Sequence, residues 1–206
     1  MKQGFKISSI VLALLFLFTS RAQTSSNSGW FSLGARSTLS AFSHEGIGVG
    51  TGGQFRIQLT DQVNTEWFAD YISINVEDKV RSDYYHIGWS VMFYPFKELK
   101  YPKKLQPYVI AGHCFDYNRM AEIANVSNVK DRWGSAVQAG LAGHLNLTER
   151  FDITLISQYM IHLTKKLEAD VDGASVHIGE QKETALHGHL LTTLSLNYKI
   201  AKLWKK

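Results

Sequence analysis

The sequence predicts an all-β fold: an eight-stranded antiparallel up-and-down transmembrane β-barrel with short periplasmic turns and longer extracellular loops. Three observations predict it. Apolar and polar residues alternate with a period of two from Trp30 onward. The predicted connections are short at one end and long at the other, and the apolar faces carry aromatic residues. The 206 residues are 45% hydrophobic and 19% charged, with 16 Gly and 3 Pro, which excludes a disordered chain, a coiled coil and a collagen-like repeat.

Residues 1–22 have the three-part pattern of a secretory signal peptide. Two lysines open the segment, the apolar run Ile10–Phe18 follows, and small residues lead to Ala22, after which we expect cleavage. The run has nine residues, whereas a transmembrane helix needs about 20. We therefore expect an exported chain that begins with a short linker at 23–29.

Charge and cysteine content narrow the possible partners. Three of the 22 basic residues and none of the 18 acidic residues lie in the signal peptide. The remaining chain is nearly neutral, which excludes an electrostatic footprint for nucleic acid. Cys114 is the only cysteine, so no disulfide forms within one chain. We expect it to be a packed apolar residue.

Eight segments show the strand alternation. It is clear at Gly53–Leu59, where Phe55 and Ile57 alternate with Gln54 and Arg56. The predicted strands are Trp30–Phe42, Gly53–Leu59, Asn64–Ile74, Tyr84–Phe96, Pro107–Phe115, Trp133–Leu147, Phe151–Leu163 and Ala185–Ile200. The fifth has two largely apolar faces, so its lumen-facing side stays unassigned. The barrel is expected to span 30–200, with a basic tail at 201–206.

The predicted connections differ in length at the two ends. The long ones are 43–52, 75–83, 116–132 and 164–184, and the others are the turns 60–63 and 147–150 and the longer segment 97–106. Long loops on one side and short turns on the other are typical of barrels in outer membranes. The glycine-rich run Gly46–Gly53 is interpreted as part of an outer loop, because it lacks the Lys and the following helix of a phosphate-binding loop.

Residue types decide which face of the alternation meets lipid. A soluble barrel is apolar inside, and a membrane barrel is apolar outside. The polar faces are nearly free of Lys and rich in small residues, which suits a narrow lumen better than a solvated surface. A periplasmic barrel or sandwich is the alternative. The aromatic residues expected to form interfacial girdles on the apolar faces are Phe31, Trp67, Tyr71, Tyr85, Trp89, Trp133, Tyr159 and Tyr198.

Two segments, Leu105–Gly112 and Thr193–Tyr198, together with the signal peptide, resemble the outer-membrane β-barrel domain family, which includes small porin-like and OmpA-, OmpX- and OmpW-like barrels. The resemblance implies a Gram-negative type outer membrane, contact with its lipid and lipopolysaccharide, and assembly of a monomer by periplasmic chaperones and the barrel-assembly machinery. The family often ends on an aromatic residue, a role open here to Tyr198 or Trp204, although the basic tail departs from that pattern.

Charged residues on the polar faces predict a filled lumen. Four charges on the first three strands should pair, because a lone buried charge is very costly. The hypothesis is that they plug the lumen, so that removing both acids would change conductance. The bulky residues Phe68, Met92, Ile156 and Met160 share the inward phase. The predicted interior polar network is Arg36, Arg56, Glu66, Asp70, Gln138 and Gln158.

Four of the eight histidines lie on polar faces near the expected outer rim: His86, His162, His187 and His189. Clustered imidazoles can hold a transition metal. Hydrogen bonding inside a filled lumen explains them better, because no His, Cys and carboxylate spacing matches a known metal site. No cofactor or metal is therefore expected.

We expect a structural or surface-interaction role and no enzyme activity. A hydrolase needs a nucleophile beside a base and an orienting acid. Small lipid A deacylase barrels carry a His-x-Ser pair, whereas this chain has only His162-Leu163-Thr164. The loops 116–132 and 164–184 are the expected contact surfaces. A narrow porin-like channel for small solutes is the alternative, and a surface lipid or peptide hydrolase is the third possibility.

Overall fold

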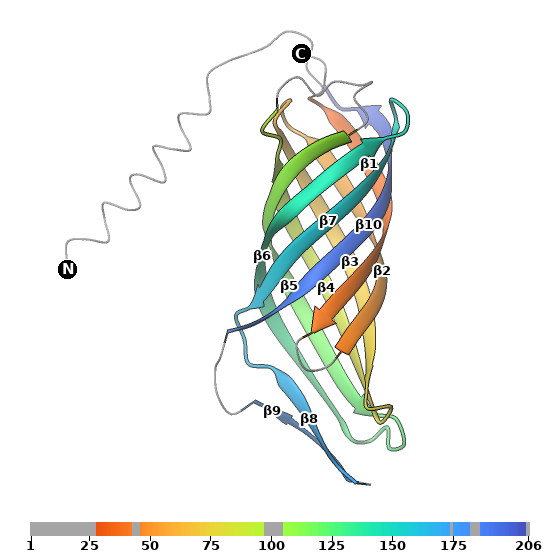
Figure 1. Ribbon diagram of the computed structural model, residues 1–206, viewed down its shortest axis with the longest axis vertical. Helices are drawn as coiled ribbons and strands as arrows, with labels where there is room; N and C mark the ends of the chain where they lie inside the picture. Colours follow the sequence, from red (N-terminus) through yellow and green to blue (C-terminus); the bar gives the residue numbers. More distant parts are fainter. Residues whose placement is uncertain (1–27, 43–45, 97–104, 174, 182–185, 205–206) are drawn as a thin grey trace, which may run out of the picture.

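In the described part of the chain, eight strands close on themselves to form a β-barrel (Figure 1). The structure is a computed structural model that describes residues 28–42, 46–96, 105–173, 175–181 and 186–204. The predicted signal peptide lies outside these residues. No described helix is long and apolar enough to cross a membrane. The strands are β1 (Trp30–Phe42), β2 (Gly46–Gln58), β3 (Val63–Val76), β4 (Val80–Phe93), β5 (Leu105–Glu122), β6 (Val129–Asn146), β7 (Phe151–His162), β8 (Leu167–Asp172), β9 (Ser175–Glu180) and β10 (His187–Lys202).

The barrel has up-and-down topology. Its strands follow the order β1-β10-β7-β6-β5-β4-β3-β2, and every neighbouring pair is antiparallel. β10 closes the barrel against β1, from Trp30↔Lys202 to Ala41↔Leu190. It therefore runs past the predicted strand end at Ile200. Closure satisfies the backbone groups that a lipid environment would otherwise leave unpaired.

The outer wall of the barrel is apolar. Leu33, Ile87 and Leu141 point outward and are 47%, 59% and 68% exposed, while the polar residues that alternate with them are buried. A wall of this kind would be an unusually large apolar surface in water, but in a bilayer it contacts lipid. The inside-out pattern confirms a membrane barrel rather than a soluble one.

Aromatic rings form a band across β3–β6, which we call the outer girdle. Tyr71, Tyr85, Tyr117 and Trp133 lie on successive strands, with ring-centre separations of 5.0, 5.8 and 5.0 Å. Aromatic side chains of this type lie at the membrane–water interface. The strand segments beyond the girdle therefore lie outside the bilayer.

Three predicted long loops, 43–52, 75–83 and 116–132, are mostly strand. β2 begins at Gly46, β3 and β4 are joined by the turn Glu77–Lys79, and β5 and β6 are joined by residues 123–128. The predictions of 75–83 and 116–132 were wrong because β3–β6 continue past the outer girdle. There the inward face carries buried apolar residues such as Ile74 and Val80 and the outward face becomes polar, as at Arg81, so the alternation changes phase. The predicted strand Tyr84–Phe96 also ends earlier, at Phe93. Residues 97–104 lie outside the described residues.

The turn between β3 and β4 escaped prediction because its sequence is unusual. Glu77 and Asp78 have φ angles of 50° and 56°, and the Lys79 amide donates to the Val76 carbonyl at 3.1 Å. Two consecutive residues with positive φ make a type I′ turn, which matches the twist of a hairpin. Asn-Gly or Asp-Gly is the usual signal for this turn, and neither is present here.

The glycine-rich run Gly46–Gly53 belongs to β2, which corrects its interpretation as a loop. Gly52 pairs with Arg36 on one side and with Asp70 on the other. A Cβ atom on Gly52 would collide with Asp70 Oδ1 and with the backbone carbonyl of Ala69. The glycine is therefore needed because it leaves the space in which two charged side chains meet.

The fourth predicted loop, 164–184, contains the hairpin β8–β9, which lies beyond the barrel at the end opposite the start of β1 (Figure 1). Its apolar face packs on the strand segments beyond the girdle. Leu167 and Ile178 join Val80 and Met120 in a cluster in which each residue is at most 2% exposed. We call the hairpin and these segments of β3–β6 the outer module.

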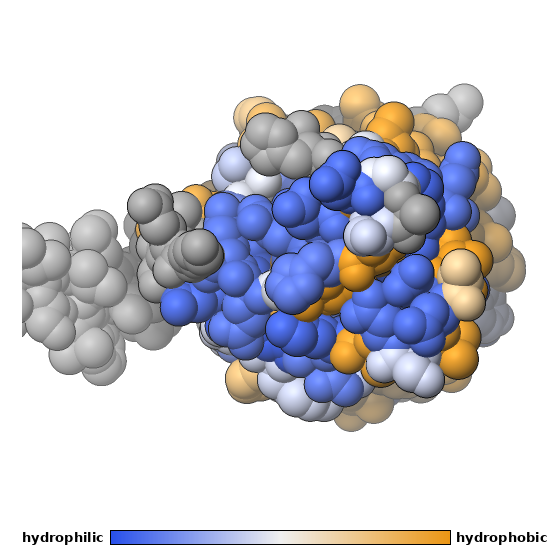
Figure 2. All heavy atoms as spheres, turned by 90° about the horizontal axis from the view of Figure 1, so that it is seen from below, coloured by the Kyte–Doolittle hydropathy of each residue, from blue (hydrophilic) through white to orange (hydrophobic). Residues whose placement is uncertain are grey.

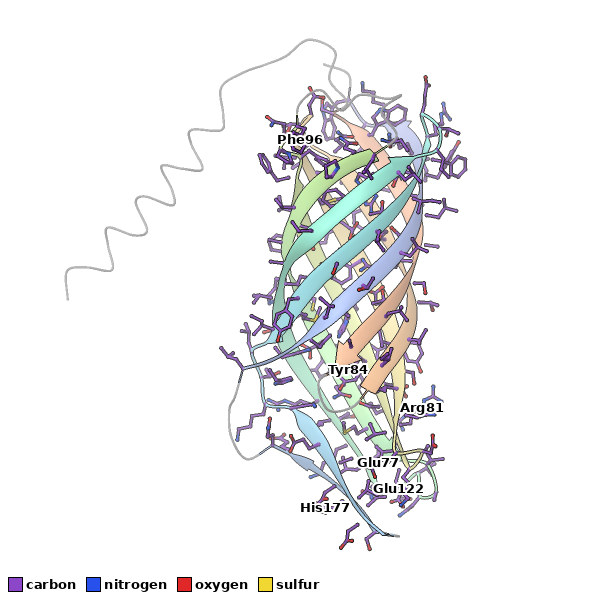
Figure 3. All side chains as sticks on the ribbon, in the orientation of Figure 1. Glu77, Arg81, Tyr84, Phe96, Glu122 and His177 are labelled. Carbon is purple, nitrogen blue, oxygen red and sulfur yellow. The ribbon has the colours of Figure 1, made fainter. Side chains whose placement is uncertain are left out.

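Two hydrogen bonds also fasten the hairpin. Lys79 Nζ donates to the Gly173 carbonyl at 2.6 Å, and Asn128 Nδ2 donates to the Val176 carbonyl at 2.9 Å. Figure 3 places Glu77, Glu122 and His177 at this end of the molecule and Phe96 at the opposite end. The end face is largely hydrophilic and is bordered by hydrophobic residues (Figure 2).

The two ends of the barrel can be assigned to the two sides of the membrane. The start of β1, the end of β10 and the turns 59–62 and 147–150 lie at the end opposite the hairpin (Figure 1). Barrels of outer-membrane type have short periplasmic turns and place their larger connections outside. The outer module is therefore the extracellular end.

Candidate functional site

The lumen contains the four predicted charges, joined in one chain of ion pairs. Glu66 lies between Arg36 and Arg56, with Oε1 3.3 Å from Arg36 Nη1 and Oε2 2.8 Å from Arg56 Nε. Arg36 Nε is 3.0 Å from Asp70 Oδ1. All four side chains are at most 3% exposed. Pairing of this kind offsets the cost of burying each charge.

Neighbouring groups complete the surroundings of the two arginines. The Arg36 guanidinium lies over the Phe68 ring, 4.5 Å from its centre, and Arg36 Nη2 donates to Thr193 Oγ1 at 3.4 Å. Arg56 Nη1 is 3.2 Å from Asp152 Oδ1. The ion-pair chain therefore crosses the lumen from β3 through β1 and β2 to β7.

The two predicted glutamines form a separate chain. Gln158 Nε2 donates to Gln138 Oε1 at 3.1 Å, and Gln138 Nε2 donates to Ser90 Oγ at 3.0 Å. All three side chains are buried. The predicted network is therefore two groups, one ionic and one neutral.

A cluster at the periplasmic end was missed as a site. His144 Nδ1 and Nε2 lie 2.6 Å from Thr154 Oγ1 and from the Tyr94 hydroxyl, respectively. His144 Nδ1 is also 3.5 Å from Asp152 Oδ1. His144 and Asp152 were on predicted polar faces, so the inward phase was available from the sequence. Their partnership was not, because it depends on the register between β6 and β7.

The four predicted rim histidines come together at the extracellular end of the lumen. His162 Nε2 lies 3.2 Å from His189 Nδ1, and the His187 ring stacks on His162 with centres 4.8 Å apart. His86 lies 6.4 Å from His162 and 6.3 Å from His189, measured between ring centres. His86, His162 and His189 are at most 3% exposed. The burial of His86, His162 and His189 agrees with their predicted inward phase, whereas His187 is only partly buried.

Asp116 joins this histidine cluster and was not predicted. Its Oδ2 is 3.1 Å from His162 Nδ1. The sequence assigned it to a loop, and the faces of its strand were unassigned because both are largely apolar. Cys114, on the same face of β5, is fully buried and lies 3.9 Å from Met160 Sδ.

Large apolar side chains fill the remaining lumen. Phe68, Met92, Ile156 and Met160 are at most 5% exposed, as their inward phase predicts. A cavity of about 20 Å³ lies at the extracellular end, lined by Asp116, His162 and other residues, and one of about 30 Å³ lies at the periplasmic end. Each holds about one water molecule.

One carboxylate beyond the outer girdle has a shifted pKa. Burial alone would raise the pKa of Asp83, but its Oδ1 accepts hydrogen bonds from Ser73 Oγ at 2.7 Å and from the Tyr71 hydroxyl at 2.8 Å, and Arg81 Nε lies 3.0 Å away. Together these interactions hold the pKa of Asp83 below its ordinary value. Asp83 and its partners therefore tie β3 to β4 beside the girdle residue Tyr71.

Comparison with known proteins identifies the architecture. No protein-family model matches the chain, and no curated protein matches it in sequence. Solved structures do match. Neisserial surface protein A is 11% identical with a TM-score of 0.54, and the comparison covers 86% of this chain and 100% of that one.

Two further structures agree. The N-terminal β-barrel domain of Pseudomonas aeruginosa OprF is 14% identical with a TM-score of 0.52, covering 85% of this chain and 100% of that one. A major outer membrane protein from Thermus thermophilus is 11% identical with a TM-score of 0.52, covering 83% of this chain and 98% of that one. At these identities the likeness establishes the fold, and this chain has the eight-stranded β-barrel architecture of outer-membrane proteins.

Proposed function

We propose that the protein is a non-enzymatic outer-membrane barrel with a closed lumen, which presents the outer module to partners at the cell surface. The observation that carries the proposal is the packed cluster of Val80, Met120, Leu167 and Ile178 beyond the girdle. A connection that served only to join β7 to β10 would not need a hydrophobic core of its own. An ordered surface suits recognition, since less conformational entropy is lost when a partner binds to it.

The hairpin strands of this module are acidic, whereas its segments of β3–β6 also carry basic residues. Glu168, Asp170, Asp172 and Glu180 are exposed on the hairpin. The partners that suit this surface are a basic protein segment, or lipopolysaccharide bridged by divalent cations. We also propose that lipid and lipopolysaccharide surround the apolar wall, and that periplasmic chaperones and the barrel-assembly machinery assemble the barrel; the exposed apolar wall supports both.

A closed lumen argues against the channel alternative. The ion-pair chain around Glu66 and the buried side chains of Met92, Ile156 and Met160 occupy the interior. The cavities at the two ends are too small for a solute larger than water. We therefore expect no steady conductance from the native protein in a planar bilayer.

The described groups also argue against an enzyme. His162 and Asp116 form a base–acid pair, but His162 Nε2 faces His189 rather than a hydroxyl. His144 does lie beside the Thr154 hydroxyl, but Thr154 is fully buried and no substrate can reach it. A nucleophile must be both activated and accessible.

Two experiments test the proposal. In planar bilayers, the native protein should give a flat current record, and the double variant Glu66→Gln/Asp70→Asn should give transient openings. In intact cells, a Ser175→Cys variant should react with a membrane-impermeant maleimide, while a Thr148→Cys variant should react only after the outer membrane is permeabilised. Buried Cys114 supplies the unreactive background.

Each experiment has a contradicting result. Steady native channels of a size that passes small solutes would replace the proposal with the porin-like function. Labelling at position 148 but not at 175 in intact cells would place the outer module on the periplasmic side and remove its surface role.

A further inference from the structure

The histidine cluster at the extracellular end of the lumen has the geometry of an incomplete metal site. We propose that His162 and His189 bind a divalent transition-metal ion of the zinc or copper type, with His86 as the third ligand and Asp116 as the group that orients His162. This inference is independent of the proposed surface role.

The spacing of the first two ligands carries the argument. Two nitrogens bound to one tetrahedral ion at about 2.05 Å are separated by about 3.3 Å, and their ring centres by about 5.2 Å. His162 Nε2 and His189 Nδ1 are 3.2 Å apart, and their ring centres are 5.0 Å apart. Both distances match those of two ligands of one ion, and without metal the same contact is a hydrogen bond between the two rings.

Asp116 supplies the second feature. A metal-binding histidine usually donates its other ring N–H to a carboxylate, which fixes the tautomer and makes the ligating nitrogen more basic. Asp116 Oδ2 lies 3.1 Å from His162 Nδ1. That contact leaves the lone pair of His162 on Nε2, the nitrogen that faces His189. Without metal, His189 Nδ1 can donate to this lone pair, and binding requires that His189 move its proton to Nε2, which is also buried.

His86 is placed to complete the site. Its Nε2 is buried and has no hydrogen-bond partner among the described residues, a costly state for a ring nitrogen. Its ring centre lies 6.4 and 6.3 Å from those of His162 and His189, about 1 Å farther than a shared tetrahedral ion requires. The described residues hold no finished group of three donors around one point. In our proposal, rotation of the His86 side chain brings its ring about 1 Å closer to His162 and His189, so that it can bind the same ion.

A small cavity lies beside one ligand of the site, His162. The cavity of about 20 Å³ at the extracellular end is lined by Asp116, His162 and His187, and it is large enough for one water molecule or ion. Arg132, Lys165 and Lys166 also line the cavity, and Arg132 Nη1 donates to the Lys165 carbonyl. A metal ion that enters here therefore passes three positively charged residues. Imidazole nitrogens favour zinc, copper and nickel over magnesium and calcium, so the ligand set selects the ion.

The test is a metal titration of the folded protein, without a histidine tag, in detergent micelles. We expect Zn²⁺ to bind with a stoichiometry of one per chain in the presence of excess Mg²⁺. His189→Gln should weaken binding at least tenfold, and Asp116→Asn should weaken it about 10- to 100-fold. His113→Ala and His177→Ala, which remove histidines from the outer wall and the hairpin, should leave the affinity unchanged.

A spectroscopic measurement on the native protein keeps the proposal testable if a variant fails to fold. Bound Cu²⁺ should give an electron paramagnetic resonance spectrum with hyperfine structure from at least two imidazole nitrogens. Absence of stoichiometric Zn²⁺ binding would overturn the proposal. An unchanged affinity in folded His189→Gln would overturn it, as would a Cu²⁺ spectrum with oxygen ligands alone.

Discussion

Neutralising Glu66 should destabilise the barrel more than any exposed charge change does. Its carboxylate is 1% exposed and binds Arg36 and Arg56 through separate oxygens, at 3.3 and 2.8 Å. Glu66→Gln keeps the shape but removes the negative charge. The carbonyl oxygen of the new amide can still accept a hydrogen bond from one arginine, while its NH₂ group faces the other.

The magnitude follows from the burial of all three groups. Removing one partner of a buried ion pair costs about 3–5 kcal/mol. Because the amide keeps one acceptor, and because Asp70 and Asp152 still pair with the two arginines, we expect about 3 kcal/mol. That corresponds to about a hundredfold larger unfolding equilibrium constant.

The assay is reversible urea unfolding in phospholipid vesicles, followed by tryptophan fluorescence. Glu168→Gln is the matched control, since Glu168 is exposed on the hairpin and the same change there should cost less than about 0.5 kcal/mol. A Glu66→Gln protein as stable as the control would refute the reasoning, because it would mean that the ion-pair chain contributes nothing to the fold.

Three other substitutions test particular contacts. Gly52→Ala should lower the free energy of urea unfolding by about 2 kcal/mol or more, because the new Cβ collides with Asp70 Oδ1. Gly53→Ala should be tolerated, because its Cβ would lie 3.8 Å from the nearest atom; equal effects of the two substitutions would contradict the packing. Ile178→Asp should release the hairpin, so that protease cuts it while the barrel keeps its gel mobility; an uncut hairpin would contradict its docking. Asp83→Asn should lower the free energy of unfolding by about 1 kcal/mol at pH 7. Because folding lowers the pKa of Asp83, the stability difference between the native protein and the variant should shrink as the pH falls below about 4; a stability difference independent of pH would contradict the interactions of Asp83.

The sequence was sufficient for the barrel and for the inward phase of most strands. Alternation identifies which face a residue occupies, and the scarcity of Lys on the polar faces identifies the lumen. This is why the burial of Arg36, Arg56, Glu66 and Asp70 could be predicted. Their pairing also followed, since a narrow lumen leaves buried charges no other partners.

The extent of the strands beyond the girdle could not be predicted. Past the girdle the apolar residues of β3–β6 lie on the inward face, as at Ile74 and Val80, instead of the outward one, so the period-two pattern changes phase and these segments resemble loops. Asp116 was missed because β5 was predicted to end at Phe115 and its two faces are largely apolar. The glycines of β2 misled for another reason: Gly52 is required by close approach to Asp70, which is a property of the register and not of the local sequence.

The central claim is that the apolar wall faces lipid around a closed barrel. Fractionation of cells followed by electrophoresis of the unboiled and boiled protein tests it most directly. We predict recovery in the outer-membrane fraction and a change in mobility on boiling, because an eight-stranded barrel stays compact in cold detergent. Recovery as a soluble periplasmic protein whose mobility does not change on boiling would contradict the claim.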